Sequence, residues 1–466
     1  MVHLYSMHGR SFALDVNSGA VLEVDKLTYD MLSLLEKHDD KNGGHDLREK
    51  LPDDVLDRLR EQYELKDIET ARNEVSELIN SEMLYTPDVY EDIAKKSGEL
   101  APVKALCLHV AHDCNLRCEY CFASTGDFGG TRKLMDLETG KKAIDLVILK
   151  SRGRRNIEID FFGGEPLMTF GVVKKITEYA SEQGRLHNKN FRFTITTNGV
   201  LLNDENMEYI NEHMSNVVLS LDGRKEVNDR VRKTASGGGS YDVIAPKLLK
   251  MAKLRGDREY YVRGTFTKYN KDFSNDVLHL ADAGFDQISV EPVVSDPKLA
   301  YSLTEDDLPQ IYEEYERLAK IMYDRICAGE GFNFFHFMLD LTQGPCVIKR
   351  LHGCGSGNEY LAVTPEGDIY PCHQFVGHSE YKMGNVHESD ELDLTIKKTF
   401  AENNVYSKPE CKKCWAKFYC SGGCAANNFQ MRGDIKLPNT IACELEKKRV
   451  ECAIWLAAAL NDREEN

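Results

Sequence analysis

Short apolar runs alternate with longer amphipathic stretches between residues 103 and 294. Each run has the length of a buried strand, and each intervening stretch is long enough to form a helix. The predicted strands span residues 105–110, 157–162, 191–196, 217–221, 260–266 and 287–290. Strands separated by helix-length connections favour a parallel α/β sheet. We therefore expect an α/β fold over residues 101–300, with either an open sheet or an incomplete barrel.

Unusual residues cluster just after these predicted strands. They are Cys114, the run Gly163-Gly164-Glu165-Pro166, the run Thr197-Asn198-Gly199 and the run Ser220-Leu221-Asp222-Gly223. In parallel barrels the ligand site is built at the C-terminal ends of the strands. The pattern predicts a partial (β/α)6 TIM-like barrel with its site at this end.

The chain before the barrel has a different pattern. Two short apolar runs flank an Asn17-Ser18-Gly19 turn, which is typical of a β-hairpin. Two helical patterns follow the hairpin. These elements occupy residues 12–16, 20–24, 27–37 and 69–81. We expect a small α+β module over residues 1–90, followed by a polar linker over residues 88–99.

The chain after the barrel begins with an amphipathic pattern over residues 304–327, which predicts a helix in a bridging segment, 301–345. Residues 346–443 hold eight cysteines and many glycines but little sustained periodicity. This composition indicates a loop-rich domain organised by metal. A helix over residues 444–460 is expected to close the domain, which spans residues 346–466.

The composition limits the cellular locations and the kinds of partner that we expect for this protein. The 466-residue chain has no apolar run of membrane-spanning length, and its start lacks a basic patch followed by an apolar stretch, so we expect a cytoplasmic protein without a membrane partner. A formal net charge of −17 argues against nucleic acid as the main partner. In a reducing compartment, fourteen cysteines favour metal ligation or catalysis over disulfides.

Three cysteines directly after the first barrel strand have the spacing CxxxCxxC: Cys114, Cys118 and Cys121. Three thiolates bound to a four-iron cluster leave one iron free to bind a small molecule. The alternative is a structural zinc site with a distant fourth ligand such as His112.

This motif resembles the signature of the radical S-adenosylmethionine (SAM) superfamily, in which an aromatic residue, here Tyr120, precedes the third cysteine. The resemblance implies that the open iron holds the amino and carboxylate groups of SAM. It also implies that the cluster donates the electron that cleaves SAM to a 5′-deoxyadenosyl radical. The protein then has to orient the cofactor and exclude solvent.

The turn Gly163-Gly164-Glu165-Pro166 follows the second barrel strand. Its glycines allow close approach to a ligand, and Glu165 can accept hydrogen bonds from an ammonium group; an ordinary strand-to-helix turn is the alternative. By resemblance the turn is the motif for the SAM amino group, and Ser220 and Arg232 hold its carboxylate or ribose. A solvated surface arginine is the alternative for Arg232. Arg263, inside a predicted strand, needs a partner that the sequence does not name.

Seven further cysteines form a C-terminal array. Cys354 is followed by Gly367 and Cys372, then by a run with the spacing Cx2Cx5Cx3C and by a last cysteine. The array comprises Cys354, Cys372, Cys411, Cys414, Cys420, Cys424 and Cys443. It resembles the seven-cysteine pattern of SPASM domains, and two structural zinc sites are the alternative.

The SPASM resemblance implies two auxiliary clusters, and so three [4Fe-4S] clusters in all. Cluster II is expected on Cys411, Cys414, Cys420 and Cys443. Cluster I is expected on Cys354, Cys372 and Cys424, with Cys346 as a fourth ligand or with an open iron that a substrate thiolate can occupy. The other cysteines, Cys107, Cys327 and Cys452, are expected to be buried apolar residues.

Nearly the whole chain resembles the maturases of SCIFF peptides. The resemblance is carried by residues 1–16, Gly344-Pro345-Cys346, the run from Gly353 to Tyr360, and the run from Tyr370 to Phe375. It implies a thioether crosslink in a ribosomally made, cysteine-rich peptide, from a cysteine sulfur to the α-carbon of an acceptor residue such as threonine. The deoxyadenosyl radical removes the α-hydrogen, and the leftover electron enters the auxiliary clusters.

The same resemblance implies partners. The N-terminal module resembles winged-helix-like elements that capture a leader peptide as an added strand, with a packing or dimerisation module as the alternative. A donor of the ferredoxin or flavodoxin type supplies electrons. The spacing names no general base, and His373 is expected either beside a cluster or at the surface.

Two other functions stay open at this point. The chain can be another SPASM enzyme, such as an anaerobic sulfatase maturase, which oxidises one side chain and makes no crosslink. It can also be a non-catalytic iron–sulfur or zinc protein that senses redox state or scaffolds a partner.

Overall fold

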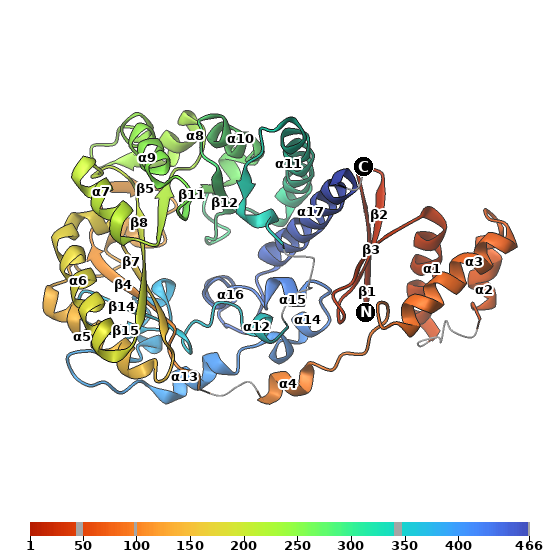
Figure 1. Ribbon diagram of the computed structural model, residues 1–466, viewed down its shortest axis with the longest axis horizontal. Helices are drawn as coiled ribbons and strands as arrows, with labels where there is room; N and C mark the ends of the chain where they lie inside the picture. Colours follow the sequence, from red (N-terminus) through yellow and green to blue (C-terminus); the bar gives the residue numbers. More distant parts are fainter. Residues whose placement is uncertain (43–49, 97–99, 340–346, 465–466) are drawn as a thin grey trace.

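The computed structural model describes residues 1–42, 50–96, 100–339 and 347–464. Its centre is a curved sheet of six parallel strands in the order β12-β11-β9-β8-β7-β4, with helices outside the curve (Figure 1). These strands are β4 (Ala105–His112), β7 (Asn156–Gly163), β8 (Asn190–Thr197), β9 (Asn216–Ser220), β11 (Tyr260–Phe266) and β12 (Gln287–Pro292). The predicted α/β fold with a partial parallel barrel is confirmed.

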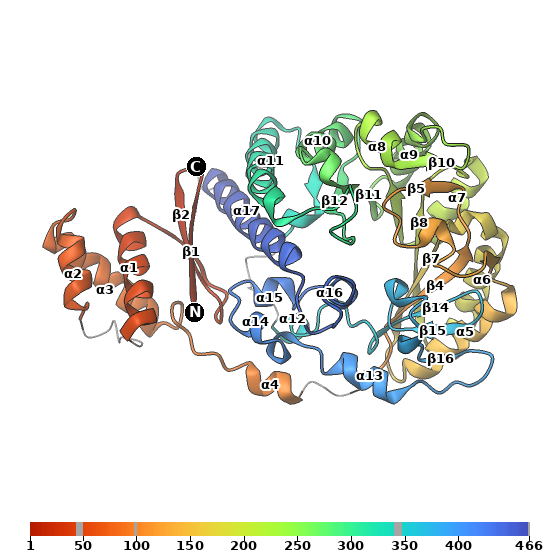
Figure 2. The same ribbon diagram turned by 180° about the vertical axis from the view of Figure 1, so that it is seen from behind.

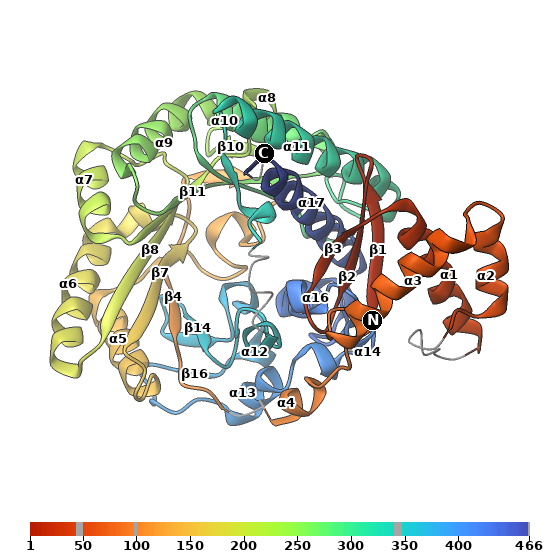
Figure 3. The same ribbon diagram turned by 45° about the vertical axis from the view of Figure 1, so that its right-hand side comes forward.

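Helices follow the strands, as the pattern requires. They are α5 (Leu137–Lys150), α6 (Phe170–His187), α7 (Asp204–His213), α8 (Lys225–Val231), α9 (Tyr241–Arg255), α10 (Ser274–Asp282) and α11 (Leu308–Ala328). Figure 3 shows α5, α6, α7 and α9 on the convex side of the sheet.

Alternating burial along the strands gives the sheet two unlike faces. On β11 the side chains of Tyr260, Val262 and Phe266 are buried towards the helices. The alternate residues Arg263 and Thr265 lie on the other face and line a pocket. The concave side of this partial barrel is therefore polar and accessible, unlike the packed interior of a closed barrel.

The C-terminal region extends this sheet, which the sequence pattern did not predict. Strand β14 (Tyr360–Val363) pairs in parallel with β4, and β15 (Asp368–Tyr370) and β16 (Gly384–Asn385) add antiparallel strands beyond it. At the other edge, β13 (Asn333–Phe334) pairs with β12. The cysteine-rich region thus joins the barrel sheet through the pairing of β14 with β4.

The rest of the C-terminal region consists of short helices and one long helix, α17, which packs along α11. The helices are α12 (Val347–Arg350), α13 (Leu394–Ala401), α14 (Pro409–Lys412), α15 (Lys417–Cys420), α16 (Ala425–Arg432) and α17 (Thr440–Glu464). The predicted closing helix is present and begins four residues earlier than expected. Every helix in the described ranges is either too short or too polar to cross a membrane.

The N-terminal module is a three-stranded antiparallel sheet with three helices. The predicted hairpin corresponds to β2 (Arg10–Asp15) and β3 (Val21–Val24), while β1 (Val2–Met7) was not predicted. The helices are α1 (Lys26–Asn42), α2 (Asp53–Arg60) and α3 (Leu65–Asn80). Sequence analysis missed α2 as well.

This module is not separate from the rest of the protein. Tyr5, Met7, Phe12 and Leu14 belong to the same buried core as the barrel and α17, whereas the other face of the sheet packs on α1–α3. Figure 2 shows the sheet beside α17 from behind. The hydroxyl of Tyr5 also donates to the carbonyl of Glu451 on α17 (3.1 Å).

The stretch predicted as a plain linker is structured where it is described. Residues 91–96 form α4 (Glu91–Lys96), and Asp88 accepts hydrogen bonds from Lys417 (2.7 Å) and Tyr406 (2.6 Å). The linker therefore contacts the cysteine-rich region.

The side chain of Asp15 stabilises the turn between β2 and β3. Its buried carboxylate accepts backbone hydrogen bonds from Asn17 (3.1 Å), Ser18 (2.9 Å) and Thr86 (3.2 Å). We expect Asp15→Ala to destabilise the module by about 2 kcal/mol, because it leaves buried donors without an acceptor. Faster hydrogen exchange over residues 2–24 would show this. Asp57→Ala, at an exposed position, removes the same charge and should leave the exchange unchanged.

Candidate functional site

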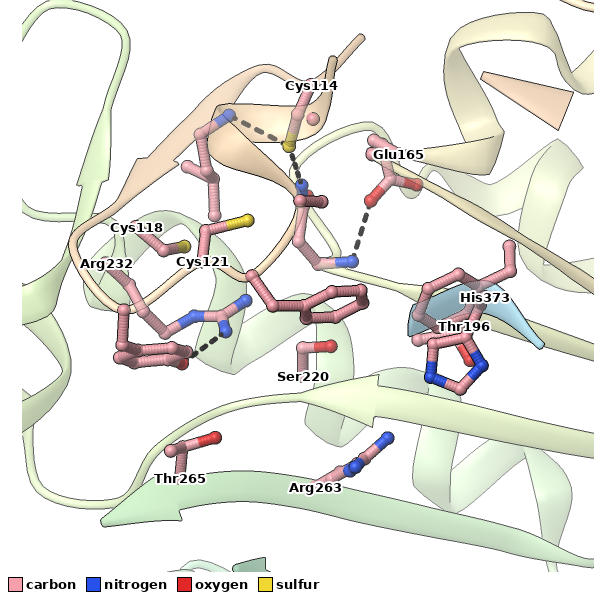
Figure 4. A pocket seen from close by; sticks show the side chains of 18 of the residues that line it. Cys114, Cys118, Cys121, Glu165, Thr196, Ser220, Arg232, Arg263, Thr265 and His373 are labelled. Atoms are coloured by element: carbon pink, nitrogen blue, oxygen red, sulfur yellow. Dashed lines mark hydrogen bonds between the residues drawn. The ribbon is translucent and has the colours of Figure 1, made fainter. Parts of the chain in front are cut away.

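A cavity of about 240 Å³ lies at the C-terminal ends of the barrel strands. The predicted cluster ligands Cys114, Cys118 and Cys121 line it together (Figure 4). The other residues predicted to bind SAM line the same cavity: Tyr120, Gly163, Gly164, Glu165, Ser220 and Arg232. The structure thus brings every one of these residues to one place.

Two backbone contacts hold the cysteine loop in position. Strand β5 (Leu116–Cys118) pairs with β10 (Arg232–Thr234), so that Cys118 faces Arg232. On the other side, the amide of Gly164 donates to the carbonyl of Ala111 (2.7 Å), and the amide of Glu165 donates to that of Asp113 (3.0 Å). The loop is held at both ends by main-chain hydrogen bonds.

The two glycines also have a structural role that the sequence did not indicate. A Cβ at Gly163 would clash with the carbonyl oxygen of Ala111, and one at Gly164 would clash with that of Asp113. Gly163 also has φ +124°, where other residues are strained. The glycines therefore admit the backbone of the cysteine loop as well as leaving room at the cavity.

Glu165 is fully buried at the cavity wall. Its carboxylate accepts hydrogen bonds from the hydroxyl of Thr197 (2.8 Å) and from the amides of Asn198 (2.8 Å) and Leu167 (3.0 Å). Burial raises the pKa of Glu165, and these donors oppose that rise. The side chain is fixed by its surroundings before any ligand binds.

Arg232 is buried, so the alternative of a solvated surface arginine is wrong. Its Nη1 donates to the hydroxyl of Tyr120 (2.9 Å), and that hydroxyl donates to the carboxylate of Asp222 (2.8 Å). The Nε of Arg232 is buried and has no partner among the described residues.

The wall opposite the cysteine loop was largely missed by sequence analysis. Arg263 donates to Glu291 on the neighbouring strand (2.8 Å), which supplies the partner that the sequence did not name. His373 also lines the cavity and packs against Phe162 with its ring tilted, with 4.9 Å between the ring centres, so it is not a surface histidine. Burial lowers its pKa to about 4. Only the tertiary fold brings these side chains together.

The cysteines predicted to hold cluster II also share a cavity. Cys411, Cys414, Cys420 and Cys443 line a hollow of about 140 Å³. Of the residues assigned to cluster I, Cys354 lines a third, smaller cavity. The thiols of Cys372 and Cys424 are close enough to Cys354 to interact with it electrostatically. Cys346 lies outside the described residues.

All the described cysteines are free thiols. Burial raises the pKa of Cys114 to about 11 and that of Cys118 and Cys443 to about 12. Without a metal such thiols stay protonated, and metal binding replaces the proton. Groups of free thiols around cavities fit iron–sulfur clusters. No three His, Cys, Asp or Glu side chains in the described ranges have the geometry for a single ion. Cys107 and Cys452 are buried as expected, whereas Cys327 is half-buried.

Comparison with known proteins agrees with these groupings. Residues 108–270 match the family model of the radical SAM superfamily, and residues 354–415 match that of the SPASM iron–sulfur cluster-binding domain. An uncharacterized protein of Methanocaldococcus jannaschii is 30% identical over 294 residues, which cover 63% of this chain and 92% of that protein. The chain belongs to the radical SAM superfamily.

This radical SAM enzyme is also similar to proteins of known activity. The cysteine-type anaerobic sulfatase-maturating enzyme of Clostridium novyi is 26% identical over 341 residues, covering 68% of this chain and 86% of that protein. The structure of native anSMEcpe with bound AdoMet aligns with a TM-score of 0.63 and 22% identity over 78% of this chain and all of the other. Streptococcus suis SuiB bound to S-adenosylmethionine aligns with a TM-score of 0.51 and 18% identity over 94% and 98%.

The two domains indicate SAM and [4Fe-4S] clusters as cofactors. The cavity residues fit them, because three half-buried thiols, the carboxylate of Glu165 and the guanidinium of Arg232 line one space.

The buried chain of Arg232, Tyr120 and Asp222 yields a stability prediction. Arg232→Met should destabilise the protein by about 3 to 5 kcal/mol, because the Asp222 carboxylate then stays buried without a cation. Denaturant unfolding of the anaerobic protein measures this. Adding Asp222→Asn should recover part of the loss, so that the double variant is more stable than the sum of the two single changes predicts. Strict additivity would mean that the two groups do not interact.

Proposed function

We propose that this radical SAM enzyme forms a thioether crosslink in a ribosomally synthesised, cysteine-rich precursor peptide. A hydrogen is removed from the α-carbon of an acceptor residue, and the sulfur of a peptide cysteine bonds to that carbon. One C–H and one S–H bond are lost and one C–S bond is formed. The peptide therefore loses two hydrogens, and the electron left over leaves through the auxiliary clusters.

The observation that carries this proposal is the N-terminal module and the way it is attached. The anSMEcpe structure covers 78% of this chain, whereas SuiB, which has also been solved bound to its precursor peptide SuiA, covers 93 to 94%. An alignment over that share of the chain has to include most of the N-terminal module. A three-stranded sheet in a peptide-modifying enzyme suits the capture of a leader as an added strand.

In the described residues, the edge of that sheet at β3 suits an added strand better than the edge at β1. In the described residues β1 pairs with β2 on one side and packs on α17, while β3 pairs only with β2. The amide of Asp15 donates to the carbonyl of Ala20 (2.9 Å), which makes these two a hydrogen-bonded pair. Because such pairs alternate along an antiparallel ladder, Leu22 bonds to β2, and the amide and carbonyl of Glu23 point to the free edge.

The cavity assigns tasks to its own residues. When bound, the cluster and SAM supply the radical that removes the hydrogen. Cys114, Cys118 and Cys121 would hold that cluster, Glu165 would accept from the SAM amino group, and Arg232 would donate to its carboxylate. Tyr120 and Asp222 keep Arg232 in place. We also propose that the protein binds three [4Fe-4S] clusters, one at each of the three cysteine groups described above.

Sulfatase maturation is the second candidate, because sulfatase-maturating enzymes are among the relatives and match 68 to 72% of this chain. Such a reaction oxidises one side chain and consumes no peptide thiol in a crosslink. The two candidates therefore differ in product.

The deciding experiment is an anaerobic assay with SAM, a strong reductant and the cysteine-rich precursor peptide encoded beside the gene, analysed by mass spectrometry. We expect loss of two hydrogens, consumption of one free thiol and formation of 5′-deoxyadenosine. Deoxyadenosine without a change in the peptide would overturn the substrate. A sulfatase peptide converted in its place would favour the second candidate.

The sheet edge gives a matched pair of variants. Glu23→Pro removes the outward amide, whereas Glu23→Ala removes the side chain and its ion pair with Arg10 but keeps the amide. We expect Glu23→Pro to weaken peptide binding at least tenfold with SAM cleavage intact, and Glu23→Ala to bind like the unaltered protein. Fluorescence anisotropy with a labelled leader measures the affinity. Equal binding by both variants would contradict capture at β3.

A further inference from the structure

A buried lysine lies between the two groups of auxiliary cysteines. Lys408 is 1% exposed, and its Nζ donates to the carbonyl of Gly422 (2.6 Å). It lines the small cavity that also contains Cys354. No role has been assigned above to this side chain.

The thiols around Lys408 come from both groups. Cys411, Cys420 and Cys443, which share the cluster II cavity, all interact electrostatically with its ammonium, and so does Cys424 of the other group. Cys420 and Cys424 are joined by the loop Ser421-Gly422-Gly423, which contains the carbonyl that Lys408 binds. The lysine is therefore fixed to the segment that connects the two cysteine groups.

That loop has an unusual backbone. Ser421, Gly422 and Gly423 have φ of +60°, +83° and +73° in succession. Three left-handed residues in a row turn the chain sharply, and Ser421 is strained there because it has a Cβ. The turn lets Cys420 line one cavity, while Cys424 lies among the thiols of the other group.

No carboxylate forms an ion pair with Lys408 in the described part of the chain. Its strongest charge interactions are with the thiols of Cys411, Cys420, Cys424 and Cys443. By contrast, the equally buried Lys417 pairs with Asp88 (2.7 Å). A buried ammonium without a counter-ion costs several kcal/mol. Metal-bound thiolates would supply the missing negative charge, because a cluster held by four thiolates is an anion.

We propose that Lys408 is a positioning residue whose fixed positive charge is shared by the two auxiliary clusters and raises the reduction potential of both. A nearby cation stabilises the more negative, reduced form of each cluster. The inference rests on one part of the proposed function, namely that these cysteines hold clusters. It does not depend on the peptide or on the crosslink.

The test is an EPR-monitored redox titration of the iron-replete, full-length enzyme. Lys408→Met and Lys408→Gln, which remove the charge, should move both auxiliary signals to more negative potentials. Lys408→Arg, which keeps the charge, should stay near the unaltered protein. The signal from the cluster at Cys114, Cys118 and Cys121 serves as an internal reference that should not move.

Lys397→Met is the matched control. Lys397 is also buried and also donates to carbonyls, those of Ala101 and Asn358 (both 3.0 Å), but no cysteine is among the groups that act on it. Its loss should lower stability and leave all potentials unchanged. Unshifted auxiliary signals in both neutral Lys408 variants, or equal shifts in Lys397→Met, would overturn the inference.

A second measurement needs no variant. In enzyme produced with ¹⁵N-labelled lysine, pulsed EPR of the reduced cluster at Cys354, Cys372 and Cys424 should detect a magnetically coupled nitrogen. Absence of that coupling would overturn the proposal even if the variants fail to fold. Iron content separates this from failure of the proposed function. Clusters with the expected shifts but an unmodified peptide would support Lys408 and reject the crosslink, whereas protein that cannot be loaded at the auxiliary cysteines would reject both.

Discussion

The close backbone contact between the cysteine loop and the end of β7 is the constraint on which the site depends. The amides of Gly164 and Glu165 bond to carbonyls of the segment that leads into Cys114, at a separation that excludes any side chain at Gly163 or Gly164. The same turn presents Glu165 to the cavity. One contact therefore sets the positions of the thiols and of the carboxylate at once, which is the kind of preorganisation that a reactive cofactor requires.

A second constraint comes from the sheet itself. Because β14 pairs with β4, the C-terminal region is attached to the same strand that leads into the cysteine loop. His373, three residues beyond β15, can then line the cavity formed by the barrel. The partial barrel leaves its concave side open, and the cysteine-rich region contributes to the wall there. The cavity is thus a joint product of two regions far apart in the sequence.

Much of this was accessible from the sequence, for physical reasons that differ by element. The barrel strands are apolar enough for their positions to be predicted to within a few residues, and the resemblance to SPASM domains grouped the four thiols that share the second cavity. Strand β1 escaped because Val2–Met7 mixes histidine, tyrosine and serine with apolar residues, and both of its faces pack on other parts. Glu291 and the burial of Arg232 escaped because they depend on partners distant in the chain. The resemblance to known families, not periodicity, selected Ser220 and Arg232.

The shared core between the N-terminal sheet and α17 limits how this protein can be recombined. Its helices α1–α3 pack on one face of the sheet, but the other face contributes Tyr5 and Phe12 to a core that also contains Trp455. A chimera cut at the polar stretch near residue 90 would expose that surface on both fragments. Exchange of this N-terminal module for another therefore requires the matching face of α17 to be exchanged with the N-terminal sheet, although the two are far apart in the sequence.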